Sequence, residues 1–103
     1  MDFMDFKYRM VECADGFTMS VQASEDMYSC PRENTGPYTS VEVGYPSEPE
    51  ELLEQYAEDP EKLVDTVYPF VPVATVGLVL AKHGGMVDGE VPEGVPKLVA
   101  QGK

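Results

Sequence analysis

The arrangement of polar and apolar residues over positions 7–23 constrains the fold of this chain more than any other feature of the sequence. Polar and apolar residues alternate strictly along Phe17–Ala23 and less regularly along Lys7–Cys13, and Ala14-Asp15-Gly16 lies between the two runs. Alternation is typical of a strand with one buried face, and Asp-Gly favours the positive φ of a tight turn. We therefore expect a β-hairpin. On its second strand the core-facing residues would be Phe17, Met19, Val21 and Ala23, and the water-facing residues Thr18, Ser20 and Gln22.

Two further strands are expected. Tyr38–Gly44 alternates again after a long loop over Ser24–Pro37, and Tyr45-Pro46 would end this third strand. Thr66–Val71 is rich in β-branched and aromatic residues, which favours a fourth strand. The place of the fourth strand in the sheet stays open from the sequence.

Helix signals follow the third and the fourth strand. Ser47 and Glu50 have the spacing of a capping box, and the helix that they predict would end at Asp59-Pro60, because the residue before proline avoids helical geometry. A second helix is expected from Pro72 to about Lys82. It is apolar nearly all round, which favours burial in the core.

The order β-β-β-α-(β)-α indicates an α+β fold, with an antiparallel sheet of three to four strands and two helices packed on one face. A chain of 103 residues corresponds to one domain. We expect residues 1–86 to form this compact domain. Residues 87–103 are interrupted by glycine and proline and are expected to form a loosely ordered C-terminal tail, in which Val95–Ala100 could dock as a short segment.

Charge narrows the functions open to the chain. It has 19 acidic and 7 basic residues, a formal net charge of -12. Such a polyanion is excluded from binding nucleic acid through phosphate neutralisation, whereas it complements basic protein surfaces. Much of the excess lies in residues 48–65, where Lys62 is the only basic residue. The acidic residues of this stretch are Glu48, Glu50, Glu51, Glu54, Glu58, Asp59, Glu61 and Asp65.

Two surfaces are candidates for contact with a partner. On the expected helix, Glu50, Glu54 and Glu58 recur every four residues and would form a row, although such a face can also serve only solubility. The second candidate is the loop around Tyr28 and Arg32, because tyrosine and arginine are enriched at interface hot spots. The alternative is that the tyrosine only packs the loop onto the sheet.

Signals for enzymatic chemistry are weak. Cys30 and His83 form the one possible thiol–imidazole pair, and no local motif supports them. One histidine and two cysteines match no zinc pattern, and the acidic stretch lacks the spacing of a calcium loop. No glycine-rich phosphate loop is present. We expect no cofactor and no metal, and reduced thiols in a cytoplasmic protein, because the acidic N-terminus resembles no signal peptide and no apolar run is long enough for a bilayer.

Three segments resemble small accessory proteins of tailed bacteriophages and prophages. They are Asp15–Ser24 (DGFTMSVQAS), Gly36–Gly44 (GPYTSVEVG) and Lys82–Gly85 (KHGG), and the resemblance spans residues 8–86. It implies a compact phage protein of the kind that blocks host defence, anti-CRISPR proteins among them. Many such inhibitors are acidic and occupy a nucleic-acid site. No functional residue carries over from the resemblance.

The leading hypothesis is a non-enzymatic, phage-encoded protein that docks on a basic, nucleic-acid-handling surface of a host protein, in the host cytoplasm. It would not bind nucleic acid or membrane directly, and a homodimer remains open. Its partner-binding residues are expected to be Glu50, Glu51, Glu54, Glu58, Asp59, Glu61, Tyr28 and Arg32.

Three alternatives from other classes remain. The chain could bind a small ligand such as a signalling nucleotide, which would require Lys7, Arg9 and Arg32 to gather in one pocket. It could be an enzyme that uses Cys30 and His83. It could also be a minor structural or replication component of a phage.

Overall fold

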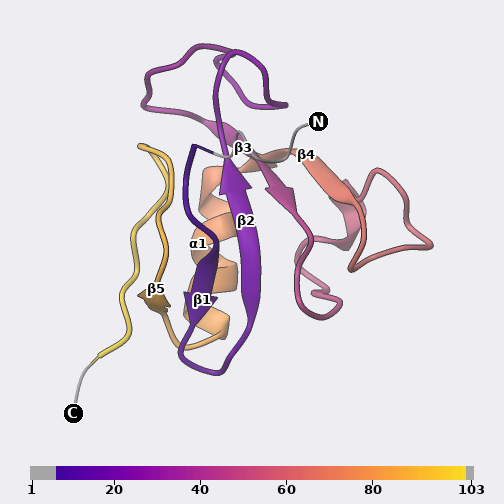
Figure 1. Cartoon of the computed structure of the whole chain (residues 1–103), viewed down its shortest axis with the longest axis vertical. Coiled ribbons are helices and arrows are strands. Elements are labelled where there is room, and N and C mark those ends of the chain that lie inside the picture. The colour runs from indigo at the N-terminus through magenta and orange to yellow at the C-terminus, as the bar shows by residue number, and fades with distance from the viewer. Residues whose placement is uncertain (1–6, 102–103) are drawn as a thin grey trace.

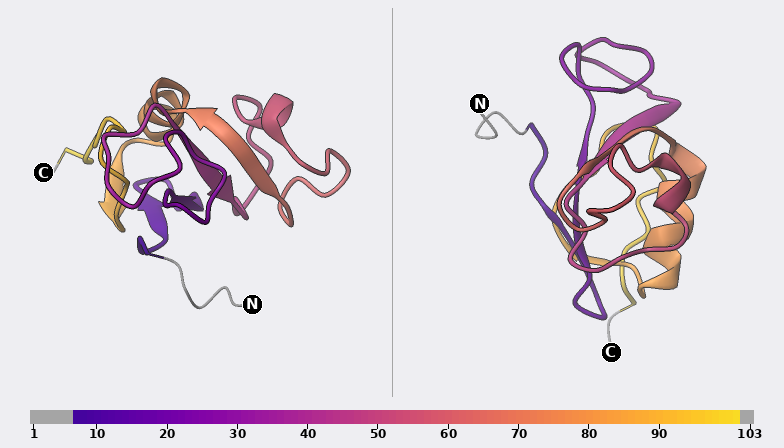
Figure 2. Two further views of the ribbon diagram at one scale, coloured as in Figure 1. Left: turned by 90° about the horizontal axis from the view of Figure 1, so that it is seen from above. Right: turned by 90° about the vertical axis from the view of Figure 1, so that its right-hand side faces the viewer.

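The fold consists of one five-stranded antiparallel sheet with a single helix on one of its faces (Figures 1 and 2). The computed structural model describes residues 7–101, so residues 1–6 of the expected domain and the last two residues of the expected tail lie outside the described residues. The strand order is β4-β3-β2-β1-β5. The elements are β1 (Val11–Cys13), β2 (Thr18–Gln22), β3 (Ser40–Gly44), the 3-10 turn η2 (Glu54–Tyr56), β4 (Val67–Pro72), α1 (Val73–Lys82) and β5 (Met86–Asp88).

The α+β class is confirmed, whereas the numbers of strands and helices were wrong. The helix expected from Ser47 to Asp59 does not form, and turns with the short η2 take its place. Tertiary contacts outweigh the local helix signal here. The Ser47 hydroxyl accepts a hydrogen bond from the Thr18 N–H at 3.0 Å instead of capping a helix, and the Glu58 N–H donates to the Val67 carbonyl of β4 at 2.9 Å.

The predicted hairpin is confirmed as β1 and β2. Its core-facing residues Phe17, Met19, Val21 and Ala23 are all buried. The water-facing side of β2 was partly wrong, because Ser20 and Gln22 are buried as well. Lys7 and Tyr8 lie against this side of β2, and the side-chain oxygen Oε1 of Gln22 accepts their backbone N–H groups, each at 3.0 Å. A second face that looked solvated is therefore closed by a neighbouring segment.

The later elements lie close to their predicted bounds. β4 is an edge strand that pairs with β3, which settles the position that the sequence left open. α1 runs over nearly the predicted residues, but its expected burial all round was wrong. Val76, Val79 and Leu80 are buried, whereas Leu78 is 58% exposed. A chain this short has too few other elements to cover the outer side of the helix.

The C-terminal segment packs along the domain, and its contacts extend beyond the stretch Val95–Ala100 for which docking was considered. Met86–Asp88 forms β5 beside β1, and the Met86 N–H donates to the Leu98 carbonyl at 2.8 Å. The Tyr38 N–H donates to the Glu93 carbonyl at 2.8 Å. Between these points Val95 is buried. Backbone hydrogen bonds hold a segment that has no regular pattern of its own.

Within residues 7–101, no helix is long and apolar enough to cross a membrane. Both cysteines are free thiols, Cys13 buried in β1 and Cys30 exposed. Cys30 pairs through its backbone with Ser40 at the start of β3.

Candidate interaction surface

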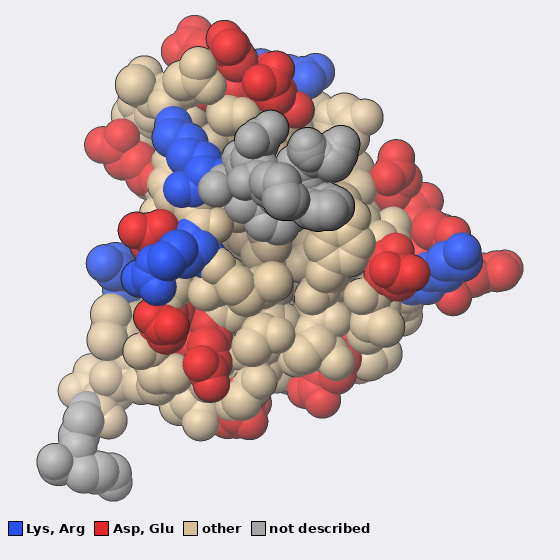
Figure 3. All heavy atoms as spheres, in the orientation of Figure 1, with Lys and Arg blue, Asp and Glu red and all other residues tan. Residues whose placement is uncertain are grey.

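The acidic segment, defined as residues 47–65, connects β3 to β4 and exposes most of its carboxylates. It is held to the domain by Leu53, which is fully buried. Figure 3 shows acidic side chains crowding the projecting end that this connection forms beside β4. Asp59 is half-buried, and its carboxylate accepts the Glu61 N–H at 3.0 Å. The exposed acidic residues of the segment are Glu48, Glu51, Glu54, Glu58, Glu61 and Asp65.

Glu50 does not belong to this exposed set, which corrects its expected role as a surface contact. Its carboxylate is 1% exposed. One oxygen lies 2.8 Å from the Lys82 ammonium and 2.9 Å from the Leu52 N–H, and the other lies 2.6 Å from Nε2 of His83. The expected row of three glutamates is absent as well, because the residues are not on one helix. Neutralising Glu50 would therefore perturb the fold rather than a surface.

His83 joins three parts of the chain that are distant in sequence. Its ring stacks on Phe17 with the centroids 4.0 Å apart, Nδ1 lies 2.6 Å from the Asp15 carboxylate, and Nε2 lies 2.6 Å from Glu50. We call Asp15, Glu50, Lys82 and His83 the histidine cluster. It fastens the acidic segment to the β1–β2 turn and to the end of α1.

Opposing effects set the pKa values in the histidine cluster. Burial by itself lowers the pKa of His83, but hydrogen bonds to Glu50 and Asp15 outweigh it and raise that pKa above its ordinary value. Burial likewise raises the pKa of Glu50, yet the hydrogen bonds from Lys82, the Leu52 N–H and His83 bring it below its ordinary value. The charged side chains of the cluster are thus paired and hydrogen-bonded to one another. Buried charges are stable inside a protein only when they are paired in this way.

The sequence did not predict the histidine cluster. Its members lie up to 68 residues apart, and no local motif connects them. The one available signal was a lone histidine next to Lys82 at a helix end, in a chain with many carboxylates. That signal predicts a favourable helix end but does not indicate which carboxylates bind the ring.

The second group comprises Tyr28, Arg32 and Phe70, which we call the aromatic cluster. The Arg32 guanidinium lies 5.7 Å from the centre of the Tyr28 ring, and the Tyr28 and Phe70 rings lie 5.8 Å apart at 50°. Tyr28 is 41% and Phe70 46% exposed. The sequence analysis singled out Tyr28 and Arg32 but missed Phe70, which looked like an ordinary strand residue. The structure adds it through the hydrogen bond from its N–H to the Tyr28 carbonyl at 3.1 Å.

Cys30 and His83 are not brought together. Cys30 lies in the loop before β3, whereas His83 lies beside the β1–β2 turn, and these are opposite ends of the sheet (Figure 1). Both ring nitrogens of His83 bind carboxylates, so neither is available to activate a thiol. The thiol–imidazole pair of the enzyme alternative is therefore not formed.

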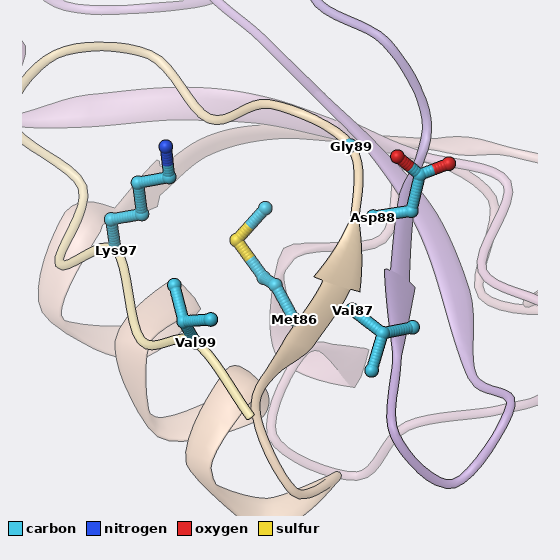
Figure 4. Close-up of a pocket in the computed structure, with 6 residues that line it drawn as sticks. All are labelled: Met86, Val87, Asp88, Gly89, Lys97 and Val99. Carbon is cyan, nitrogen blue, oxygen red and sulfur yellow. The ribbon is translucent and has the colours of Figure 1, made fainter. Parts of the chain in front are cut away.

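The residues that the small-ligand alternative names do not gather in one pocket. A hollow of about 280 Å³ lies between β5 and the C-terminal segment, where Met86 faces Lys97 and Val99 (Figure 4). Of the residues around it only Met86 is buried, so it is a surface hollow. The three cations that a nucleotide pocket would need have separate partners: Arg9 pairs with Asp88 and Glu90, Arg32 covers Tyr28, and Lys7 donates to Asn34. Residues 7–101 contain no group of three or more His, Cys, Asp or Glu side chains arranged to hold a metal ion.

The chain matches no family model, and the comparisons with curated proteins and with solved structures found no match. Its fold and surfaces place it in the α+β class, with an exposed acidic segment and an exposed aromatic cluster.

Proposed function

We propose that the protein is a non-enzymatic binding module that docks on a basic surface of another protein through its acidic segment. The observation that supports this best is that one carboxylate of the segment is buried and paired while others are exposed and form no ion pair in the described part of the chain. Glu50 is buried and paired, whereas Glu51, Glu54, Glu58 and Glu61 take part in none of the salt bridges between described residues. The segment is fixed in place while its other carboxylates remain free for a partner.

Free carboxylates on a fixed segment favour fast association with a cationic partner. The attraction between opposite charges speeds the encounter, and added salt screens it. The proposed contacts are Glu51, Glu54, Glu58, Asp59 and Glu61, with Glu50 as the residue that holds them in position. Because Asp59 is half-buried and caps a local turn, it would contribute less than the four exposed glutamates.

The concrete form of the proposal is a phage-encoded inhibitor of a host defence system, comparable to anti-CRISPR proteins. Two arguments support it. The segments at 15–24, 36–44 and 82–85 resemble phage accessory proteins, and a net charge of -12 complements the basic surfaces on which host proteins hold nucleic acid. The partner would then be a nucleic-acid-handling protein of the bacterial cytoplasm.

The test is a pull-down from bacterial lysate at low and at high salt, with mass spectrometry of the eluted proteins. A triple variant, Glu54→Gln with Glu58→Gln and Glu61→Gln, should lose the partner captured at low salt. The control neutralises three exposed acids outside the segment, Glu12→Gln with Glu33→Gln and Glu93→Gln, and should retain it. Equal capture by both triple variants would refute the acidic-segment contact, because both change the net charge by the same amount.

A further inference from the structure

Phe70 is held in a backbone conformation that a bulky residue rarely adopts. Its φ is +51°, and it lies where the register between β3 and β4 shifts, between the Val41–Val71 and Val43–Tyr68 pairs. A left-handed conformation at such a residue costs stability and persists only where the surrounding structure enforces it. Since the side chain is 46% exposed, burial in the core does not account for it. The conformation presents an aromatic ring at the surface.

One ring of the aromatic cluster already binds a guanidinium. The protein's own Arg32 guanidinium lies over the Tyr28 ring at 5.7 Å, within the range of a cation–π contact. Among the described residues, no cation lies over the Phe70 ring. The cluster therefore has one occupied aromatic ring and a neighbouring one that is exposed and without a cation.

One carboxylate binds the backbone of Tyr28, and two more belong to the same loop. Glu42 on β3 accepts the Tyr28 N–H at 2.9 Å, and the exposed Glu25 and Asp26 precede Tyr28 in the same loop. Figure 1 shows that this loop lies at the end of the sheet where β4 passes into α1. A guanidinium placed on Phe70 would meet an aromatic face, with Glu42 bound to the neighbouring Tyr28 backbone. An aromatic face suits its flat, delocalised charge better than a lysine ammonium.

We propose that Tyr28 and Phe70 form an anchor site for an arginine side chain of a basic partner. The guanidinium would lie on the Phe70 ring beside Tyr28, with Glu42 contributing negative charge. This inference rests on the proposed function, since it supplies the aromatic contact of the same basic protein, and it adds a position that is separate from the acidic segment.

The experiment uses a fluorescent nona-arginine peptide as the probe, titrated at low salt into the full-length chain. Phe70→Gly removes the ring and allows the positive φ without strain, so the variant should remain folded in a thermal melt followed by circular dichroism. The matched control is Tyr45→Gly, because Tyr45 is also aromatic, has φ +51° and is 43% exposed. Phe70→Gly should raise the Kd about fivefold. Tyr45→Gly should leave it unchanged.

Amide chemical shifts of the ¹⁵N-labelled wild type locate the peptide. Shift changes at Tyr28 and Phe70, together with the selective loss in Phe70→Gly, would establish the anchor site. Binding that shifts only residues 47–65 and is unaffected by Phe70→Gly would overturn the anchor while leaving the acidic-segment proposal standing. A wild type that binds nona-arginine at neither place would overturn both. Should Phe70→Gly unfold, Phe70→Asn replaces it, since asparagine tolerates a positive φ.

Discussion

Replacing Glu50 with alanine should lower the free energy of unfolding by about 3 kcal/mol. The carboxylate is 1% exposed and binds Lys82, His83 and the Leu52 N–H. Its loss leaves a buried ring nitrogen and a backbone N–H without partners, and removing one partner of a buried ion pair costs about 3–5 kcal/mol. The lower end applies here, because the Lys82 side chain is 46% exposed and can turn to water, and Asp15 still binds the ring.

The assay is urea denaturation followed by far-UV circular dichroism, since the chain contains no tryptophan to report by fluorescence. For a domain of this size the expected loss lowers the urea midpoint by about 2 M. It would also lower the melting temperature by about 15 °C. The control is Glu51→Ala, which removes an adjacent, exposed glutamate and should change the free energy by less than about 0.5 kcal/mol.

The reasoning is refuted if Glu50→Ala and Glu51→Ala unfold at the same urea concentration. That result would mean that the histidine cluster does not hold the acidic segment, and that residue 50 behaves as an ordinary surface position. Glu50→Gln separates charge from shape, because glutamine keeps the size of the side chain and an acceptor for the Leu52 N–H. It should cost less than alanine but more than the Glu51 control.

Three other predictions test further parts of the structure. Carboxylates outweigh burial and raise the pKa of His83 in the folded protein. The difference in unfolding free energy between wild type and His83→Gln should therefore be largest below the ordinary histidine pKa of 6.5 and should shrink as the pH rises through the folded-state pKa. A difference that is independent of pH would contradict this. Burial, with nearby carboxylates, raises the pKa of the Cys13 thiol to about 11. At pH 8 a thiol reagent should therefore label Cys30 in the native state and both thiols only after unfolding. Rapid labelling of a native Cys30→Ser variant would show that Cys13 is accessible and would contradict the prediction. Gly94→Ala should destabilise the fold by about 2 kcal/mol in the same urea assay. The φ of Gly94 is +109°, and a Cβ there would overlap the backbone of Tyr38. An unchanged urea midpoint would show that the C-terminal segment is not docked.

The elements that the sequence predicted well are those in which local pattern and tertiary environment agree. The β1–β2 hairpin follows from alternation around Asp15-Gly16, and α1 follows from a continuous apolar run after Pro72. In the hairpin the apolar residues Phe17, Met19, Val21 and Ala23 are all buried, whereas in α1 only one side of the apolar run is, since Leu78 is exposed. The alternation did not predict that Ser20 and Gln22 on the other side of β2 are buried as well.

The errors arose where contacts between distant segments outweigh a local signal. Ser47 and Glu50 have the spacing of a capping box, but Ser47 binds the backbone of β2 and Glu50 binds Lys82 and His83, so the helix is replaced by turns. β5 has only three residues and no pattern of its own, and it forms because β1 and the C-terminal segment lie on either side of it.

The candidate surfaces show the same division. The net charge of -12 and the acidic composition of residues 48–65 are determined by the sequence alone. Which carboxylates reach solvent was decided by the tertiary structure, because Glu50 and Glu51 are chemically the same and differ only in what folds over them. The pairing of Tyr28 with Phe70 across 42 positions of the chain belongs to the fold as well, since only the sheet brings the two rings together.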